Sequence, residues 1–423
     1  MAERLDNKSI LIYDHGYHPG LAMTLAESYG HVYYHVPSES SLPTMNLGKL
    51  GTGISDIDVI DNIFPVLDKI DMAVFTDIGE GKTQDWLRKQ GMRVWGAGSG
   101  GERLERDRVW TKKRMTSLGL PVGPYEVVKG ITALRAYLQA HDNQVVKLSN
   151  WRGHWETTTA LKYWLIQSDL NNLQHDITPW EESTEFVVEE MIDGIEAGVD
   201  TFIVNGQIPE LVLTGIEAKD EGYVMKFVKY ANLHPAVTQF TTAMQSYFAE
   251  VGYCGFFSDE TRITKQQVGY TIDPTCRVPE PPGSAIQLLY HNLPIVMWEG
   301  AGGQLVEPIP AAPYGVEIVI KSETAATQCQ PIRFSRKYAK FIKLHNCCKV
   351  GNQWYIIPQA IGACEIGAVI GLGSSVKAAF EMAKEVAASI EGPHIKVADG
   401  SIDKIREQLD IAKSYGVDIF GGK

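Results

Sequence analysis

The chain has 423 residues, of which 44% are hydrophobic and 21% charged, so it can form two or three domains with buried cores. Its formal net charge of -12 argues against broad electrostatic capture of nucleic acid or of an anionic membrane. The six cysteines form no CxxC pair, the N-terminal residues lack the apolar core of a signal peptide, and no apolar run reaches the ~18 residues of a membrane span. We therefore expect a cytoplasmic protein with reduced thiols and no membrane association.

Short apolar runs alternate with helical patterns over the first hundred residues. This alternation predicts an open α/β sheet and an N-terminal domain over residues 1–100. The expected strands cover 8–13, 31–36, 71–76 and 92–95, the expected helices cover 20–29 and 84–90, and a loop rich in Ser, Gly, Pro and Thr covers 37–56.

The residues after the first strand read DHGYHPG. Open α/β sheets place ligands at the carboxyl ends of their strands, and a helix that begins near residue 20 offers free N–H groups to an anion. We therefore expect His15, Gly16 and His18 to contact part of a substrate. Asp77 follows a later strand and would share the same crevice.

A basic helical pattern over 102–118, followed by Gly119 and Pro121 as stop signals, marks the entry to a second region. Strands at 145–147 and 183–191 and a hairpin turn at Asn205-Gly206 predict a strand-rich α+β middle. A strand, a tight turn and a helix over 368–390 lie near the end of the chain. The expected divisions are 101–185, 186–300 and 301–423.

The loop GAGSGG at 96–101 matches the GxGxxG pattern of dinucleotide-binding proteins. That pattern also requires an acidic residue about 20 positions later to hold the ribose. Here that position falls in LGLP at 118–121. An NAD-dependent oxidoreductase is therefore a remote alternative, and a simple domain junction is the structural interpretation of the loop.

Two predicted apolar strands end in charged residues. Lys147 ends a Val-Val strand, where a lysine is costly to bury unless an anion approaches it. The backbone at Glu189, Glu190 and Met191 could receive the edge of an adenine, and Glu196 could accept both ribose hydroxyls. Taken alone, this second segment is also consistent with an ordinary strand that has acidic ends.

Residues 253–283 contain two strand-like runs that deliver oxygen-bearing side chains to one place. Glu260 ends the first run, and Asp273 lies near the end of the second. Mg²⁺ prefers hard oxygen ligands and is commonly shared between one or two carboxylates and substrate phosphates. Arg277 could neutralise a phosphate or a developing acyl phosphate. A surface hairpin with solvated charges is the alternative for this segment alone.

Five segments follow one another along the chain: LERDRVWTKKRM at 104–115, VVKLSN at 145–150, VVEEMIDGIEAGV at 187–199, YCGFFSDETRIT at 253–264 and IDPTCR at 272–277. In this order they resemble the signature segments of the ATP-grasp superfamily, and the chain ends are similar to glycinamide ribonucleotide synthetase and related carboxylate-amine ligases. The resemblance implies an N-terminal open α/β domain, an ATP-grasp domain of two α+β subdomains and a small C-terminal α/β region.

The resemblance also implies a role for each matched residue, with ATP and Mg²⁺ as cofactors and Mn²⁺ as a second suitable metal. For the nucleotide, Arg108 and Lys147 would contact the ATP phosphates, Glu189, Glu190 and Met191 would line the adenine slot, and Glu196 would bind the ribose. The metal would be held by Glu260, Asp273 and Thr275. Lys147 and Arg277 would be catalytic, with Arg277 meeting the transferred phosphate or carboxylate.

Three departures from the family pattern stand out. Asp273 and Thr275 replace the usual glutamate and asparagine, which makes a second metal ion less secure. The loop over 148–155 has one glycine, with Arg152 and two tryptophans, which predicts either a stiffer lid or an altered grip on the phosphates. RVPEPPG at 277–283 replaces the RFGDPE of glycinamide ribonucleotide synthetase, so phosphoribosylamine is not the expected acceptor.

The resemblance implies an enzyme that forms an amide or similar bond through an acyl phosphate and releases ADP and phosphate. Its partners would be a small-molecule carboxylate, such as an amino acid, and an amine-bearing metabolite; a nucleotide or nucleic-acid acceptor stays open. A catalytically silent ATP-grasp protein that binds nucleotide is the alternative from another class. A homodimer is the default expectation for a soluble enzyme.

Overall fold

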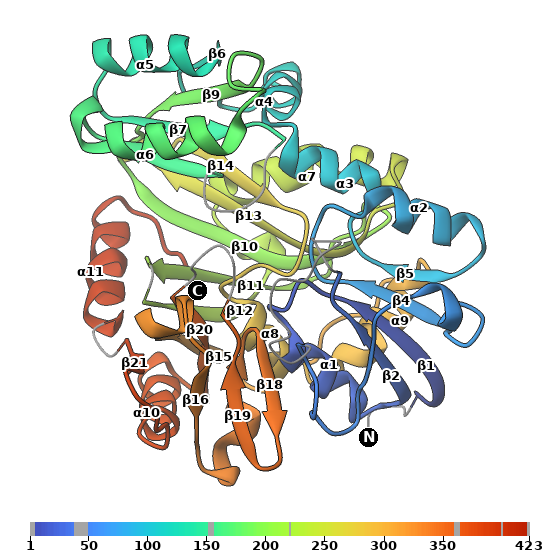
Figure 1. Cartoon of the computed structure of the whole chain (residues 1–423). Coiled ribbons are helices and arrows are strands. Elements are labelled where there is room, and N and C mark those ends of the chain that lie inside the picture. The colour runs from blue at the N-terminus through green and yellow to red at the C-terminus, as the bar shows by residue number, and fades with distance from the viewer. Residues whose placement is uncertain are drawn as a thin grey trace.

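The computed structural model describes residues 5–37, 50–150, 156–219, 221–358, 364–398 and 401–420. Within these residues the strands form sheets of five, nine, three and four strands, with helices packed on their faces (Figure 1). The predicted class, an open α/β domain followed by α+β regions, is confirmed. No helix in this described part combines the length and apolar character needed to cross a bilayer.

The N-terminal sheet is parallel, with strand order β3-β2-β1-β4-β5. The interior strand β4 and the last four residues of β1 are apolar and buried, as expected of a parallel sheet covered by helices, whereas the edge strand β3 is exposed or half-buried. Of the predicted loop over 37–56, residues 38–49 lie outside the described residues. The elements are β1 (Leu5–Tyr13), α1 (Pro19–Ala26), β2 (Tyr29–His35), β3 (Asp58–Ile60), the 3-10 helix η1 (Phe64–Val66), β4 (Met72–Phe75), α2 (Gly81–Lys89) and β5 (Arg93–Trp95).

The helix predicted over 102–118 is in fact two helices, α3 (Gly98–Arg106) and α4 (Arg108–Ser117). Asp107 separates them, because its backbone leaves the helical conformation and its side chain accepts a hydrogen bond from the Trp110 backbone N–H at 3.1 Å. An aspartate that caps the following helix competes with helical continuation. As predicted, Gly119 adopts a left-handed φ of +72° just after α4.

A four-stranded antiparallel sheet follows, in the order β6-β9-β7-β8. Two helices cover one of its faces and bury Leu134, Ile166 and Leu170 against it, in one cluster with Phe186 of the sheet. This unit lies at the top of Figure 1, away from the N-terminal sheet at the lower right. Its elements are β6 (Tyr125–Lys129), α5 (Ile131–Ala140), β7 (Gln144–Leu148), β8 (Thr157–Ala160), α6 (Tyr163–Ile177) and β9 (Glu185–Glu190).

A nine-stranded sheet forms the centre, in the order β14-β13-β10-β11-β12-β15-β20-β17, with β21 paired to β15. Asn205 and Gly206 both have positive φ in the turn after β10, which confirms the predicted hairpin. Helix α7 packs Phe240 and Phe248 against Phe257 of β13. The first elements are β10 (Ile195–Val204), β11 (Leu211–Ala218), β12 (Gly222–Lys229), η2 (Tyr230–Asn232), α7 (Pro235–Glu250), β13 (Cys254–Ile263) and β14 (Gly269–Thr275).

The C-terminal third completes this central sheet and adds a small sheet in the order β16-β19-β18. Ser375 caps α10 by accepting from the Ala378 N–H at 3.2 Å, which confirms the predicted strand, turn and helix. The elements are α8 (Gly283–Leu289), α9 (Leu293–Ala301), β15 (Tyr314–Lys321), η3 (Glu323–Ala326), β16 (Gln330–Ile332), η4 (Arg336–Phe341), β17 (Ile342–Leu344), β18 (Cys347–Val350), β19 (Gln353–Ile356), β20 (Glu365–Gly373), α10 (Val376–Ala387), β21 (Lys396–Val397) and α11 (Ser401–Ser414).

Strand pairing bears on how the chain divides, although the predicted boundaries at 100, 185 and 300 stay predictions. Strand β9 pairs with both β6 and β7, so it belongs to the four-stranded sheet. Strands β15 and β20 join the central sheet through β12, so part of the C-terminal third shares a sheet with the middle of the chain.

One buried carboxylate lies in the interior of the central sheet. Asp200 on β10 accepts hydrogen bonds from the Tyr223 hydroxyl and from the Ser258 hydroxyl, both at 2.7 Å. Burial raises the pKa of Asp200 from 3.8 to about 6, although these two donors act in the opposite direction. In the folded protein this group therefore holds its proton to a higher pH than in the unfolded chain.

A folded-state pKa above the unfolded value means that the contribution of Asp200 to stability is full below about pH 4 and is lost as the pH rises through about 6. We expect Asp200→Asn to remove this loss. The unfolding free energies of both proteins would be measured by urea titration in buffer that contains chelator. The value for the variant, relative to that of the native protein, should rise by up to about 3 kcal/mol between pH 4 and pH 7. A difference between the two proteins that does not change with pH would contradict the assignment.

Candidate functional site

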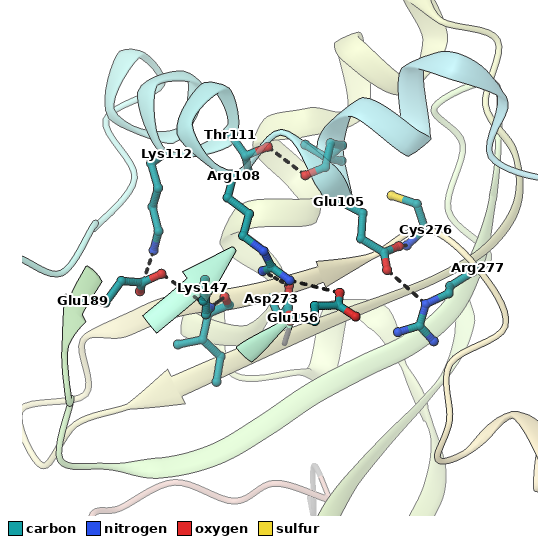
Figure 2. A network of polar contacts seen from close by, with 12 residues as sticks. Glu105, Arg108, Thr111, Lys112, Lys147, Glu156, Glu189, Asp273, Cys276 and Arg277 are labelled. Atoms are coloured by element: carbon teal, nitrogen blue, oxygen red, sulfur yellow. Dashed lines mark hydrogen bonds and ion pairs between the residues drawn. The ribbon is translucent and has the colours of Figure 1, made fainter. Parts of the chain in front are cut away.

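The predicted phosphate-binding and metal-binding residues meet between the four-stranded sheet and one edge of the central sheet. Helix α4 lies above this junction, and its side chains point down toward β7, β9 and β14 (Figure 2). The Lys147 ammonium on β7 donates to the Ile272 carbonyl on β14, which ties the two sheets together. Residues far apart in the sequence therefore form one charged cluster.

Arg108 is the first residue of α4 and is buried. Its guanidinium spans two carboxylates, with Nη1 3.0 Å from Asp273 Oδ1 and Nη2 3.0 Å from Glu156 Oε1. The cap at Asp107 starts α4 at this residue and so sets where its side chain points. Arg108 thus joins the helix, the four-stranded sheet and β14 through charge-assisted hydrogen bonds.

Lys112 lies four residues after Arg108, on the same face of α4. Its ammonium is 2.9 Å from Glu189 Oε2, and Lys147 Nζ is 3.4 Å from Glu189 Oε1. Burial alone would raise the pKa of Glu189, but Lys147 and Lys112 hold it below its ordinary value. Sequence reasoning noted Lys112 only as part of a basic helix, although its spacing from Arg108 was the available signal.

Asp273 is the carboxylate that faces most of these cations. Burial would raise its pKa, but Arg108, Lys147 and Arg277 together hold the pKa below the ordinary value. The group is therefore ionised at neutral pH. Asp273 would therefore be available to a divalent metal once its cationic neighbours pair with other anions.

Glu260 and Asp273 are direct partners in the register between β13 and β14, and Ser258 pairs with Thr275 two positions away. Because side chains alternate along a strand, Glu260, Asp273 and Thr275 share one face of the sheet. The structure thus brings together the three residues predicted to hold a metal. Whether they do so stays a prediction.

The same face holds a second carboxylate pair next to Glu260. Ligand oxygens of Glu196, Glu217 and Glu260 all lie within 4.8 Å of one another. Burial and then the charges of Glu196, Asp273 and Glu217 raise the pKa of Glu260 well above its ordinary value. Arg262 forms an ion pair with Glu196 and neutralises only part of this charge. A divalent cation would relieve the remaining repulsion.

Sequence reasoning missed Glu217. A tight two-residue turn at Asn205-Gly206 would place Gly215 opposite Glu196, whereas the observed register pairs Gly198 with Gly215 and thus shifts Glu217 opposite Glu196. The shift is two residues, so it keeps every side chain on the same face. The Asn205-Gly206 turn could therefore have predicted the face on which Glu217 lies, but not that it lies beside Glu196.

Arg277 connects this cluster to the N-terminal domain. Its Nε is 2.9 Å from Glu105 Oε1 and 3.6 Å from Asp77 Oδ1. The other oxygen of Glu105 accepts from the Cys276 backbone N–H at 2.6 Å. The buried Glu105 carboxylate on α3 therefore fixes both the backbone and the side chain at this position, and Asp77 lies where the N-terminal crevice was predicted.

A second polar corner forms where the N-terminal domain meets residues 280–284 and β17. Asp14 accepts from the His18 backbone N–H at 2.9 Å and so positions His18. Glu280 lies 3.8 Å from His18 Nδ1 and 3.5 Å from His345 Nε2. Burial lowers the pKa of His18. Sequence reasoning missed Glu280 and His345, and no local pattern signals His345.

The other predicted substrate and nucleotide residues differ in position. Gly16, with φ of +94°, closes the turn after β1, and its carbonyl accepts from the Asn346 N–H at 2.6 Å, while the His15 ring packs against Tyr13. Glu190 and Met191 at the end of β9 are exposed, and the Met191 N–H donates to the Asn143 carbonyl at 3.1 Å. Of the predicted phosphate-covering loop, residues 151–155, Arg152 included, lie outside the described residues.

The glycine-rich loop before α3 is filled by its surroundings. The Gly98 N–H donates to Gln84 Oε1 at 2.8 Å, and the Ser99 N–H lies 3.3 Å from Asp85 Oδ1. A side chain at Gly101 would collide with the Tyr253 ring. Because side chains already satisfy the first amides of the helix, this loop does not offer the open cradle that a pyrophosphate requires. The interpretation as a domain junction is favoured.

No protein-family model and no curated protein matches this sequence. Solved structures do match it. A phosphoribosylamine–glycine ligase from Thermotoga maritima is 13% identical, with a TM-score of 0.70 over 92% of this chain and 99% of that chain. The biotin carboxylase domain of a 2-oxoglutarate carboxylase from Hydrogenobacter thermophilus, solved with MgADP and bicarbonate, is 13% identical, with a TM-score of 0.67 over 98% and 96%.

An L-amino acid ligase from Bacillus licheniformis is also 13% identical, with a TM-score of 0.60 over 92% of this chain and 99% of that chain. These likenesses extend over nearly the full length of each chain. Taken together with the order of the sheets and the site between them, they show that this chain has the ATP-grasp fold, as its sequence motifs predicted.

Proposed function

We propose that this protein is an ATP-dependent ligase that joins a carboxylate to an amine and releases ADP and phosphate. One observation carries the proposal, namely the cluster in which Arg108, Lys112 and Lys147 face the carboxylates of β9 and β14 within an ATP-grasp fold. Phosphoryl transfer depends mainly on positioned cations and a divalent metal, and the cluster offers the cations together with oxygen donors that would suit such a metal.

The three cations are suited to the phosphates of ATP. Each is held by a carboxylate in the described structure, with Lys112 and Lys147 on Glu189 and Arg108 on Asp273. A triphosphate offers anionic oxygens that can take over these N–H donors. That exchange would free Asp273 from Arg108 and leave it facing Glu260. One structural neighbour holds MgADP, which supports the same assignment here.

Mg²⁺ is the metal that fits the carboxylate face, and Mn²⁺ would also suit it. Glu260 and Asp273 are paired across two strands, Thr275 adds a hydroxyl on the same face, and Glu196 and Glu217 lie beside Glu260. These are the hard oxygen donors that Mg²⁺ prefers. When bound, the metal would neutralise charge on the transferred phosphoryl group. Glu196, proposed from the sequence for the ribose, would then lie at the border between metal and nucleotide.

The chemistry requires no protein nucleophile. A substrate carboxylate oxygen attacks the terminal phosphorus, and the bond to the bridging oxygen breaks and releases ADP. The amine nitrogen then attacks the acyl carbon, phosphate leaves, and the nitrogen gives up a proton. Negative charge develops on oxygens in both steps, so a fixed cation stabilises the transition states. Arg277, held by Glu105 and Asp77, is the residue proposed to meet that charge.

Small molecules are the proposed carboxylate and amine. The N-terminal crevice at His18 and Asp77 adjoins Arg277, so a substrate bound there would reach the acyl phosphate. Nothing in the described part of the structure supports a nucleic-acid acceptor, which the sequence had left open. A nucleotide-binding protein without catalytic activity is the competing function, and the assay below separates the two.

Removal of the Lys147 ammonium should weaken ATP binding. Lys147→Ala eliminates one charge-assisted contact, worth roughly ten- to a hundredfold in affinity. The matched control is Lys113→Ala, which removes an exposed lysine from α4. Isothermal titration with ATP and Mg²⁺ should show weaker binding in the first variant alone. Equal affinities in the two variants would contradict the proposed role of Lys147.

Removal of the Glu260 carboxylate should abolish metal binding in the cleft. The raised pKa of Glu260 means that protons compete with the metal, so affinity for Mn²⁺ should fall as the pH is lowered from about 8 to about 5. Electron paramagnetic resonance of Mn²⁺ with ADP should detect this trend in the native protein and its loss in Glu260→Gln. The exposed Glu381→Gln serves as the control. Unchanged Mn²⁺ affinity in Glu260→Gln would exclude this residue as a ligand.

Acceptor-dependent ADP release is the direct test of function. The native protein, supplied with ATP and Mg²⁺ and challenged with pooled amino acids and pooled amines, should release ADP, and Lys147→Ala should release far less. Splitting the pools would then identify both substrates. Measurable ATP binding without ADP release under any combination would favour the silent nucleotide-binding function instead.

A further inference from the structure

A large cavity lies outside the ATP-grasp site, between α1, the α8–α9 segment and the C-terminal η4–β17 segment. Its volume is about 690 Å³, a size typical of pockets that hold metabolite-sized ligands. None of its lining residues lines the small cavities around Lys147 or Glu260. The cavity and the ATP-grasp site therefore share no described lining residue.

The wall of this cavity is basic in a protein whose formal net charge is -12. Arg336, Lys337, Lys340 and Lys343 line it, against the single acid Glu27. Lys337 forms an ion pair with Glu385, so three of the four cations have no carboxylate partner among the ion pairs of the described residues. A local excess of positive charge in an acidic protein favours an anionic ligand.

Lys343 is the key residue because it is buried, with 7% of its surface exposed. Its ammonium donates to the Thr24 hydroxyl at 3.0 Å, a neutral acceptor that cannot balance the charge. Burial lowers the pKa of Lys343 to about 8, an effect that Glu27 opposes. The Gln287 Oε1 atom on the same wall is buried and has no hydrogen-bond partner among the described residues. A ligand with both anionic and hydroxyl groups would satisfy both side chains.

We propose that this cavity binds a small organic phosphate. Its phosphate would lie between Lys343, Lys340 and Arg336, and its hydroxyl groups would reach Gln287. Trp354, stacked on Phe334 at 6.2 Å, forms an apolar wall beside the cations. Together these features suit a sugar phosphate more than a bare inorganic ion. The site would serve as an effector site distinct from the nucleotide cleft.

The test uses ribose 5-phosphate and inorganic phosphate as probes, with isothermal titration of the full-length protein in buffer that contains chelator and no ATP. We expect ribose 5-phosphate to bind more tightly than phosphate. Lys343→Met should lower the affinity for ribose 5-phosphate roughly tenfold or more, through loss of a charge-assisted contact. Lys377→Met removes an exposed lysine from α10 and should have no effect.

Two further variants separate this site from the nucleotide cleft and from misfolding. Lys147→Ala should bind ribose 5-phosphate as the native protein does, which makes the result independent of the proposed ligase function. Arg336→Gln changes an exposed cation of the same cavity and should also weaken binding, even if Lys343→Met fails to fold. No binding of either probe at millimolar concentration, or equal binding by the native protein, Lys343→Met and Arg336→Gln, would overturn the proposal.

Discussion

The pairing of buried cations with carboxylates across two sheets is the interaction on which the rest of the site depends. Arg108 and Lys112 from one face of α4 reach Asp273 on the central sheet and Glu189 on the four-stranded sheet. A buried charge is costly without a partner, so each of these groups requires the other in place. The same pairs hold the two sheets together and keep the cations aimed at one cleft, where the phosphates of the proposed ATP ligand would replace the carboxylates.

The register of the central sheet imposes the second constraint. Antiparallel pairing places Glu260 opposite Asp273, and Glu196 and Glu217 lie beside Glu260, so four carboxylates gather on one face. Burial and this crowding raise the pKa of Glu260, whereas the adjacent cations lower that of Asp273. The pKa values of two acids on neighbouring strands are thus shifted in opposite directions because of what each acid faces. A divalent cation held by both carboxylates would favour the ionised form of each. Metal binding would then stabilise the folded sheet.

Positive charge is concentrated in two separate places in an acidic protein. In the cleft, Arg108, Lys112 and Lys147 are neutralised by carboxylates. In the cavity beside α1, the hydroxyl of Thr24 is the only hydrogen-bond acceptor of Lys343 among the described residues. The contrast matters because an ion-paired cation releases its partner when a ligand binds, whereas a buried cation without an ion pair gains a partner. Both arrangements favour anions, but only the second leaves a buried cation without an ion pair among the described residues.

Local sequence patterns determined the parallel N-terminal sheet, the Asn205-Gly206 hairpin and the shared face of Glu260 and Asp273, because strand alternation and turn chemistry act over a few residues. The resemblance to ATP-grasp enzymes added Arg108 and the metal-binding role of Thr275. Only the tertiary structure decided that Asp107 divides the helix, that Glu217 lies beside Glu196, and that Arg108 meets Asp273 across 165 residues of chain. The corner of His18, Glu280 and His345 and the cavity at Lys343 likewise join segments from opposite ends of the chain. Contacts of this kind depend on how whole sheets pack, and no periodicity in the sequence encodes that packing.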